Sequence, residues 1–235
     1  MLEISPTEWT AIQLSLRVAT VATLVATLVA TPLGIAVAWL LARREFWGKS
    51  FVDALIHLPL VLPPVVTGYL LLLTFGRRGL IGAWLADHLG IVFAFRWTGA
   101  VLSCGVMSFP LLVRPIRLSI EAVDRRLEQA AETLGAAPWR VFLTITLPLA
   151  LPGVLAGMVL GFAKAIGEFG ATITFVSNIP GETQTISSAI YSLIQTPDGD
   201  PAALRLVIVS IVIATAALVA SEWFARRATQ RLHGN

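Results

Sequence analysis

Residues 18–41 read VATVATLVATLVATPLGIAVAWLL, an apolar run that contains no charged side chain. A helix of about 20 such residues crosses the hydrocarbon core of a bilayer. Four more apolar runs of comparable length follow at 51–75, 97–120, 149–175 and 206–224. The sequence therefore predicts an all-α fold, a polytopic membrane helical bundle with five transmembrane helices.

The composition of the whole chain agrees with a fold embedded in lipid. Of the 235 residues, 56% are hydrophobic and 13% are charged, and the mean hydropathy is +0.80. Soluble domains carry roughly 25% charged residues, so this chain has too little polar surface to face water on every side. We expect residues 1–235 to form a single transmembrane domain.

Charge, cysteine and histidine usage exclude several kinds of site. The net charge is +3, but the cations lie in short loops between apolar runs, so nucleic-acid binding is not expected. Cys104 is the only cysteine, which excludes a disulfide within the chain. The three histidines show no metal-ligand spacing, and the sequence predicts neither a metal site nor a cofactor: His57, His88 and His233.

The distribution of lysine and arginine predicts the orientation of the bundle. One set of loops and flanks holds eleven of these residues: Arg43, Arg44, Lys49, Arg114, Arg117, Arg125, Arg126, Arg140, Arg226, Arg227 and Arg231. The opposite set holds five: Arg17, Arg77, Arg78, Arg96 and Arg205. Cytoplasmic loops carry the excess of positive residues, so we expect the N-terminus outside and the C-terminus inside. Glu3 and Glu8 precede the first span in place of basic residues, so a cleaved signal peptide is not expected.

Two segments on the predicted outer side are long enough to be partly ordered. Leu80–Leu89 is weakly apolar but too short and too polar to span a membrane. Ile186–Ile194 reads as a short amphipathic helix. We expect both segments to form external caps, and a re-entrant arrangement is the alternative.

The segment 121–148 reads EAVDRRLEQAAETLGAAPWRVFLTITLP. Apolar and small residues recur at helical spacing in its first half. Gly135 is typical of the end of a helix, and Pro138 is typical of the first turn of another. The pattern predicts a helix–turn–helix on the cytoplasmic face. It is either an interfacial element without a partner or an element that docks Trp139 into a cleft of another protein.

This segment resembles the loop motif of binding-protein-dependent ABC importer permeases, which is Glu-Ala-Ala, three residues, Gly, nine residues, Ile, one residue, Leu-Pro. The whole spacing is present here, with Gln129 at the usual glutamate position and Glu128 before it. In that family the loop couples the permease to its ATPase subunit. The resemblance implies that the coupling residues are Glu128, Gln129, Ala130, Ala131, Gly135, Trp139, Arg140, Ile145, Leu147 and Pro148.

Further stretches look like those of the molybdate permeases of this family, and the likeness extends from about residue 9 to 224. They are HLPLVLPPVVTGY (57–69), GRRGLIG (76–82), GEFGATITF (167–175) and NIPGET (178–183). The resemblance implies a molybdate permease without enzyme activity of its own in the bacterial cytoplasmic (inner) membrane. The implied partners are a second copy in a homodimer, an ABC ATPase dimer and a periplasmic molybdate-binding protein. Because sulfate and tungstate permeases share the coupling loop, tungstate and sulfate/thiosulfate are alternative substrates.

One face of the predicted fourth span carries candidates for the anion path. Gly153, Gly157, Gly161, Lys164 and Glu168 follow at spacings of four, four, three and four, so they share one stripe of a helix. The glycines permit close helix packing, inside the subunit or at a dimer interface. The two charged residues form either a structural ion pair or a pair that lines or gates the path. Other candidates are the hydroxyls of Thr67, Thr172 and Thr174.

The second span contains three prolines that remove backbone donors and bend a helix: Pro59, Pro63 and Pro64. The break either exposes polar backbone to a cavity or serves packing alone.

Functions of other classes fit the sequence less well. A passive channel has no use for an element that docks an ATPase. An intramembrane enzyme with Glu168 as acid or base lacks a second catalytic group apart from Lys164. Residues 47–50, Trp-Gly-Lys-Ser, end like a phosphate-binding P-loop, but Arg43 stands where the first glycine belongs. We therefore expect ATP hydrolysis to come from a partner subunit.

Overall fold

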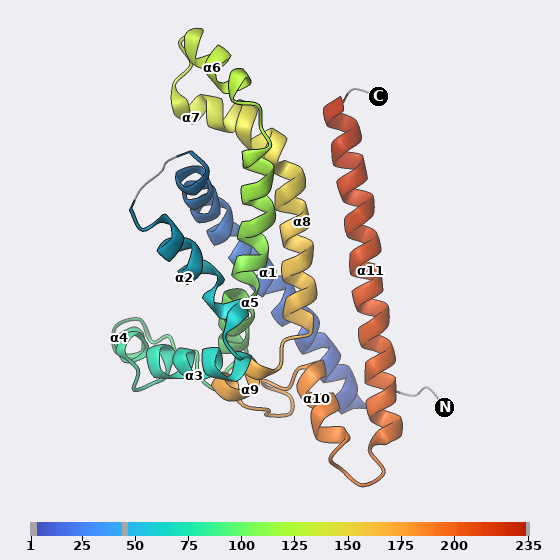
Figure 1. The fold of residues 1–235 in the computed structure, drawn as a ribbon. Coiled ribbons are helices and arrows are strands. Elements are labelled where there is room, and N and C mark those ends of the chain that lie inside the picture. Colours follow the sequence, from blue (N-terminus) through green and yellow to red (C-terminus); the bar gives the residue numbers. More distant parts are fainter. Residues whose placement is uncertain (1–3, 44–46, 234–235) are drawn as a thin grey trace.

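The computed structural model describes residues 4–43 and 47–233, with side chains described for 4–28 and 47–219, and within these residues all regular structure is helical. In chain order the elements are α1 (Pro6–Arg43), α2 (Lys49–Val61), α3 (Pro64–Phe75), α4 (Leu80–Leu89), α5 (Trp97–Glu121), α6 (Arg125–Thr133), α7 (Pro138–Val141), the π turn η1 (Phe142–Thr146), α8 (Leu147–Ile166), α9 (Gly170–Val176), α10 (Ile186–Leu193) and α11 (Asp200–His233) (Figure 1).

The described residues contain the helices needed for a five-span bundle. Four stretches are long and apolar enough to cross a membrane: Pro6–Leu28, Trp97–Glu121, Pro138–Ile166 and Asp200–Val219. The helices α2 and α3 pass the same test as one broken span that is bent by 110°. The bend lies at Pro63 and Pro64, which lack backbone donors. The predicted membrane bundle is therefore confirmed, and the break falls where the prolines predicted it.

The fourth span differs from the predicted range 149–175. Its helical stretch begins at Pro138, and α8 ends at Ile166 before the chain restarts as α9. The carboxylate of Glu168 explains the break, because its Oε1 accepts a hydrogen bond from the backbone N–H of Ala171 (2.9 Å) in the first turn of α9. Glu168 thus caps a new helix. The spacing had predicted that it continues the stripe of α8, and that prediction was wrong.

The first and fifth spans begin earlier than predicted, at Pro6 and Asp200. A reciprocal cap explains the early start of α1. The N–H of Ser5 donates to Glu8 Oε2 (2.6 Å), and the N–H of Glu8 donates to Ser5 Oγ (3.3 Å). This pairing satisfies two backbone donors that a helix start otherwise leaves free.

The central helix α5 packs between α1 and α8 (Figure 1). Along the α5–α8 seam, Ser108 Oγ donates to the carbonyl oxygen of Gly161 (3.0 Å), and Cys104 Sγ donates to that of Ala165 (3.6 Å). A Cβ atom added to Gly157 would lie 2.9 Å from the carbonyl oxygen of Leu112. Steps of four residues along α5 therefore match steps of four in reverse along α8, which is an antiparallel seam.

The short helices lie at opposite ends of the bundle. The α6–α7 pair projects at one end, and α3, α4, α9 and α10 gather at the other (Figure 1). The expected external segments are confirmed as ordered helices, α4 and α10. The N-terminus lies near α10 and the C-terminus near the end that carries α6, so the termini lie at opposite ends, as an odd number of spans requires. Which end faces the cytoplasm stays a prediction.

Candidate functional site

The helix pair α6–α7 is closed by a glycine turn. The Asp124 side chain caps α6 by accepting from the N–H of Arg126 (2.9 Å). At the other end Gly135 adopts φ +85°, a left-handed conformation that favours glycine. The N–H of Gly135 donates to the carbonyl oxygen of Glu132 (2.9 Å), and the N–H of Ala136 donates to that of Ala131 (3.1 Å). These two hydrogen bonds together form a Schellman motif. Pro138 then opens α7, as the sequence predicted.

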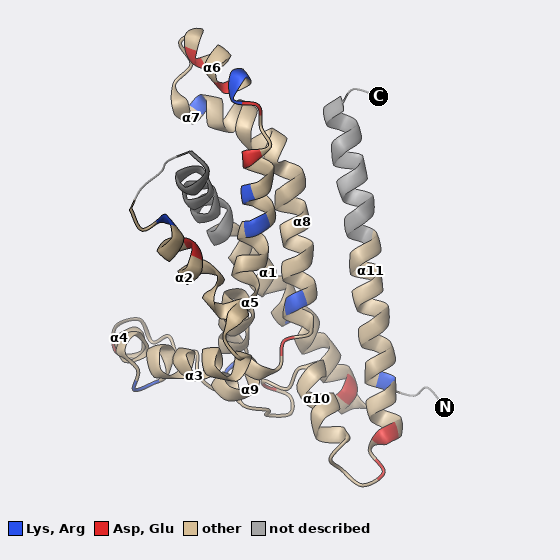
Figure 2. Cartoon of the chain, in the orientation of Figure 1, with Lys and Arg blue, Asp and Glu red and all other residues tan. Residues whose placement is uncertain are grey.

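The apolar side chains of this pair are largely open to solvent. Leu127 is 49% exposed, Leu134 89% and Trp139 61%, and the guanidinium of Arg140 lies 5.4 Å from the centre of the Trp139 ring. Gln129 and Ala130 are exposed as well. Charged residues also lie on α6 and α7, at this end of the bundle (Figure 2). Exposed apolar residues rimmed by charge are typical of a surface that binds another protein.

The junction between the helix pair and α8 is built differently. Ile145, Leu147 and Pro148 are half-buried where the π turn passes into α8. Thr146, the last residue of that turn, is 2% exposed, and its hydroxyl donates to Glu128 Oε1 (2.7 Å). This contact joins α6 to the start of α8. The sequence analysis placed Glu128 in the coupling loop but did not predict this partner, because a bond across 18 residues leaves no periodic signal.

The charged pair of the fourth span is formed at the opposite end of α8. Lys164 Nζ lies 2.6 Å from Glu168 Oε2. The Glu168 side chain is 1% exposed, whereas that of Lys164 is 28% exposed. The pair therefore bridges the break between α8 and α9, with the lysine at the more accessible side.

The three candidate threonines lie in the packed region around α3 and α9. Thr172 Oγ1 donates to the carbonyl of Phe169 (2.8 Å), and Thr174 Oγ1 donates to that of Gly170 (2.9 Å). Thr67 is 5% exposed, and its hydroxyl has no partner among the described residues. These side chains lie in and around the contact of α3 with α9 and do not line an open surface.

The second halves of the two broken spans, α3 and α9, pack against each other. A Cβ atom on Gly68 would lie 2.5 Å from the carbonyl oxygen of Ala171, and one on Gly170 would lie 2.7 Å from Pro64 Cβ. Both breaks, at Pro63–Pro64 and at Gly167–Phe169, therefore lead into one α3–α9 unit. The two breaks are thus joined by close backbone packing.

The stripe glycines pack inside the subunit. A Cβ on Gly153 would lie 2.5 Å from the carbonyl oxygen of Pro115, and one on Gly161 would lie 3.3 Å from Leu112 Cγ. Together with Gly157 they face α5 of the same chain. This is the first of the two roles that the sequence left open.

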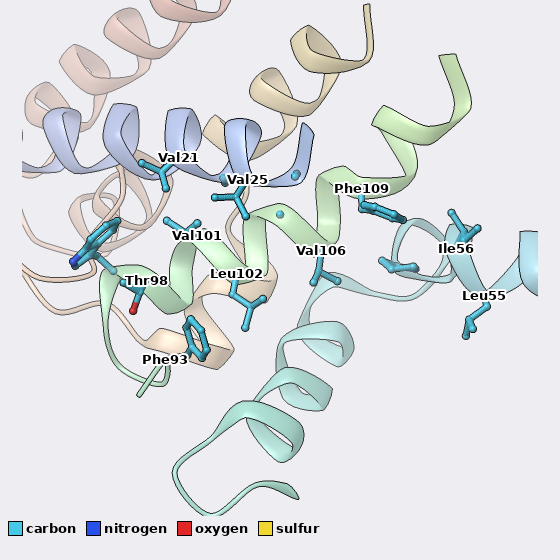
Figure 3. A pocket seen from close by; sticks show the side chains of 15 residues that line it. Val21, Val25, Leu55, Ile56, Phe93, Thr98, Val101, Leu102, Val106 and Phe109 are labelled. Atoms are coloured by element: carbon cyan, nitrogen blue, oxygen red, sulfur yellow. The ribbon is translucent and has the colours of Figure 1, made fainter. Parts of the chain in front are cut away.

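An apolar cavity of about 600 Å³ lies between α1, α2 and α5 (Figure 3). The lining includes Val21 and Val25 of α1, Val101 and Leu102 of α5, and Leu55 and Ile56 of α2. An oxyanion needs several donors to replace its hydration, and this lining offers few besides the Thr98 hydroxyl. The cavity is not suited to an anion.

Two ion pairs that the sequence did not predict tie the bundle together. Arg205 donates to Glu8 Oε1 through Nε (3.2 Å) and Nη2 (2.9 Å), and Arg117 Nη1 lies 2.7 Å from Asp53 Oδ1. The spacing of Ser5 and Glu8 could have indicated the cap. The partners of Glu8 and Asp53, in contrast, are set only by tertiary packing.

Comparison with known proteins identifies the family of the chain. Residues 30–230 match the family model described as the inner membrane component of binding-protein-dependent transport systems. The chain belongs to this family. The permease is 61% identical over 224 residues to the "Molybdenum transport system permease protein ModB" of Escherichia coli K12, covering 95% of this chain and 96% of that one. It is 59% identical to the protein of the same name from Haemophilus influenzae, covering 96% of both.

The fold of the permease agrees with solved transporters. It superposes on a chain of the MetNI methionine ABC transporter in an inward-facing conformation with a TM-score of 0.74, covering 96% of this chain and 99% of that chain at 13% identity. Family, fold and relatives agree that the chain is a multi-pass permease subunit of an ABC importer.

Proposed function

We propose that this permease carries molybdate across the cytoplasmic membrane, driven by ATP hydrolysis on a separate subunit. The observation that carries the proposal is the 61% identity to a molybdenum transport permease over nearly the whole of both chains. Sequence identity at this level over 224 residues covers the spans, the breaks and the loops together. The stretches 57–69 and 167–175, which resemble molybdate permeases, coincide with the two broken spans.

The proposed partners follow from the two ends of the bundle. An ABC ATPase dimer binds at the α6–α7 end, where Leu127, Leu134 and Trp139 are exposed. A periplasmic molybdate-binding protein binds at the opposite end, which carries α4 and α10. This arrangement places the N-terminus outside and the C-terminus inside, in agreement with the excess of lysine and arginine on the α6–α7 side.

A second copy of the chain completes the transporter. No described side chain of α2 is buried, and Phe51, Val61 and Val65 are 73%, 80% and 54% exposed. A break in a helix leaves nearby backbone groups without helical partners, and lipid cannot supply other partners. We infer that the partner copy covers α2 and α3, and that the anion path runs between the two copies.

The coupling loop transmits the motion of the ATPase subunits. Gln129, Ala130 and Trp139 supply the docking surface, with the guanidinium of Arg140 5.4 Å from the centre of the tryptophan ring. Gly135 sets the angle between the two helices, and Ala131 lies on the half-buried side of α6. Ile145, Leu147 and Pro148 anchor the pair to the start of α8.

The pair Lys164–Glu168 stands at the proposed gate. Lys164 is accessible enough to attract a dianion, while Glu168 limits how tightly that anion is held, since a path must release its ion. A double variant Lys164→Gln/Glu168→Gln removes both charges and keeps an oxygen that can cap α9. Loss of uptake in an assembled complex supports the gate, and uptake close to wild type shows that the pair is structural.

The test of the whole proposal is ATP-dependent uptake of labelled molybdate into cells whose own molybdate permease is deleted, with this chain supplied beside its cognate partners. Uptake that resists excess sulfate but yields to tungstate is the expected result. Uptake abolished by equimolar sulfate would move the substrate to sulfate/thiosulfate. A passive channel or an intramembrane enzyme predicts that no ATPase subunit co-purifies with the chain.

A further inference from the structure

We propose that Glu128 is a positioning residue, which fixes α6 to the transmembrane helix α8 through Thr146 and does not contact the ATPase subunit with its charge. The inference rests on the proposed coupling function of segment 121–148. Its basis is the 2.7 Å hydrogen bond from Thr146 Oγ1 to Glu128 Oε1.

Burial separates the two sides of α6. Leu127, Gln129 and Ala130 are exposed, whereas Glu128 and Ala131 are half-buried. The hydrogen bond to Thr146, which is 2% exposed, directs the Glu128 carboxylate toward the start of α8 in its own chain. The docking side of α6 is therefore the side that Glu128 does not occupy.

The attachment of α6 makes this bond important. The helix buries none of its own side chains, so packing alone holds it weakly. The covalent route from α6 to α8 passes through the Gly135 turn, the four residues of α7 and the π turn η1. Such π turns occur frequently at functional sites. The Glu128–Thr146 hydrogen bond links the two ends of this route directly, because Thr146 is the last residue of the π turn.

A rigid attachment has a mechanical consequence. The 20 residues of α8 form a rod about 30 Å long, and Lys164 and Glu168 lie at its far end. Displacement of α6 by the ATPase subunits reaches that pair only if α6 and the start of α8 move as one body. Without the bond, part of the displacement bends the turn at Gly135 instead.

The experiment uses the complete transporter, reconstituted with its ATPase subunit and binding protein, and measures molybdate uptake, ATP hydrolysis and co-purification of the ATPase subunit. Thr146→Val keeps the shape of threonine and removes the donor, and Glu128→Ala removes the acceptor. The matched controls are Thr146→Ser and Glu128→Gln, because each retains an oxygen that can make the bond.

We expect Thr146→Val and Glu128→Ala to lower uptake about tenfold, a factor that corresponds to the free energy contributed by one hydrogen bond to a charged group. ATP hydrolysis and co-purification stay within about twofold of wild type, so the variants spend more ATP for each anion. The two controls keep uptake within about twofold, and the double variant Glu128→Ala/Thr146→Val loses no more than either single one.

The proposal is overturned if Glu128→Gln is as damaging as Glu128→Ala and the ATPase subunit no longer co-purifies, since the charge is then the contact. Normal uptake in Thr146→Val overturns it as well. If the wild-type complex transports no molybdate, the proposed substrate fails, not the bond. Heat denaturation of the same four variants and the double variant then tests the bond, and additive losses would contradict it.

Discussion

Glu168 is a buried carboxylate that depends on two polar partners. Its carboxylate is 1% exposed and is held between the Lys164 ammonium (2.6 Å) and the N–H of Ala171 (2.9 Å). A buried carboxylate is stable only when such partners are present. Lys164, at 28% exposed, keeps part of its hydration. The two members of the pair therefore differ in how they tolerate the loss of the other.

Lys164→Met should destabilise the permease more than Glu168→Gln. The first leaves a buried charge without its counterion, at a cost of about 3–5 kcal/mol. The second leaves a lysine that water still reaches and a side-chain oxygen that still caps α9, at a cost of about 1–2 kcal/mol. Thermal unfolding of the purified protein in detergent checks the order, and an equal loss in both variants would show that the lysine is as buried as its partner.

Among the helices, the α5–α8 seam shows how backbone contact replaces side-chain packing. Gly157 lies against the carbonyl of Leu112, and the Ser108 hydroxyl bonds to the carbonyl of Gly161. Small residues allow this approach in membranes, where apolar burial between helices contributes little. The seam is therefore sensitive to single methyl groups on one side.

Gly157→Ala and Gly105→Ala provide a matched comparison. The Cβ at Gly157 lies 2.9 Å from a backbone oxygen, so the helices must move apart, which costs about 1–3 kcal/mol. The Cβ at Gly105 has nothing within 4 Å, so alanine there stabilises α5 by about 0.5–1 kcal/mol. Opposite shifts of the melting temperature are expected, and shifts of the same sign would contradict the seam.

The helix pair α6–α7 depends on one backbone conformation. Gly135→Val should lower uptake because a β-branched residue is strained at φ +85°, while Gly135→Asn tolerates that conformation and serves as the control. Uptake and ATP hydrolysis are measured together. Normal transport in the valine variant would show that the angle of the turn is not needed for coupling.

The sequence predicted these elements unequally. Pro63 and Pro64 marked the break of the second span, and Gly135 and Pro138 marked the turn of the helix pair, because each residue acts through its own backbone. The end of α8 at Ile166 was not predictable from apolar periodicity, because the sequence is largely apolar both before the break, in α8, and after it, in α9. Glu168 extended the stripe by spacing alone, although its cap on Ala171 ends it. The Thr146 and Arg205 contacts depend on packing across many residues and carry no local pattern.

At the scale of the molecule, an ion pair ties the first span to the last one. Arg205 at the start of α11 donates twice to Glu8 in the first turn of α1, across 197 residues. The Glu8 side chain is 5% exposed and also caps its own helix through Ser5. This single carboxylate thus joins the first span to the last one.

Arg205→Gln should lower the free energy of unfolding by about 1–3 kcal/mol, because Glu8 loses its charged donors while buried. Arg78→Gln removes the same charge from an exposed loop residue, and a change within about 0.5 kcal/mol is expected. Hydrogen exchange along α11 should quicken in the first variant only. Equal exchange in both variants would show that α11 is held by packing without the ion pair.

Cys104 is 1% exposed and is the single thiol of the chain, which makes the natural protein a ready background for chemical labelling. A membrane-impermeant maleimide has no accessible thiol to modify until one is introduced. Cysteines placed at exposed positions near each end, such as Trp47 and Leu80, would then report from which side of the vesicle each is reached. The sidedness of the bundle can be read in this way without first removing a native cysteine.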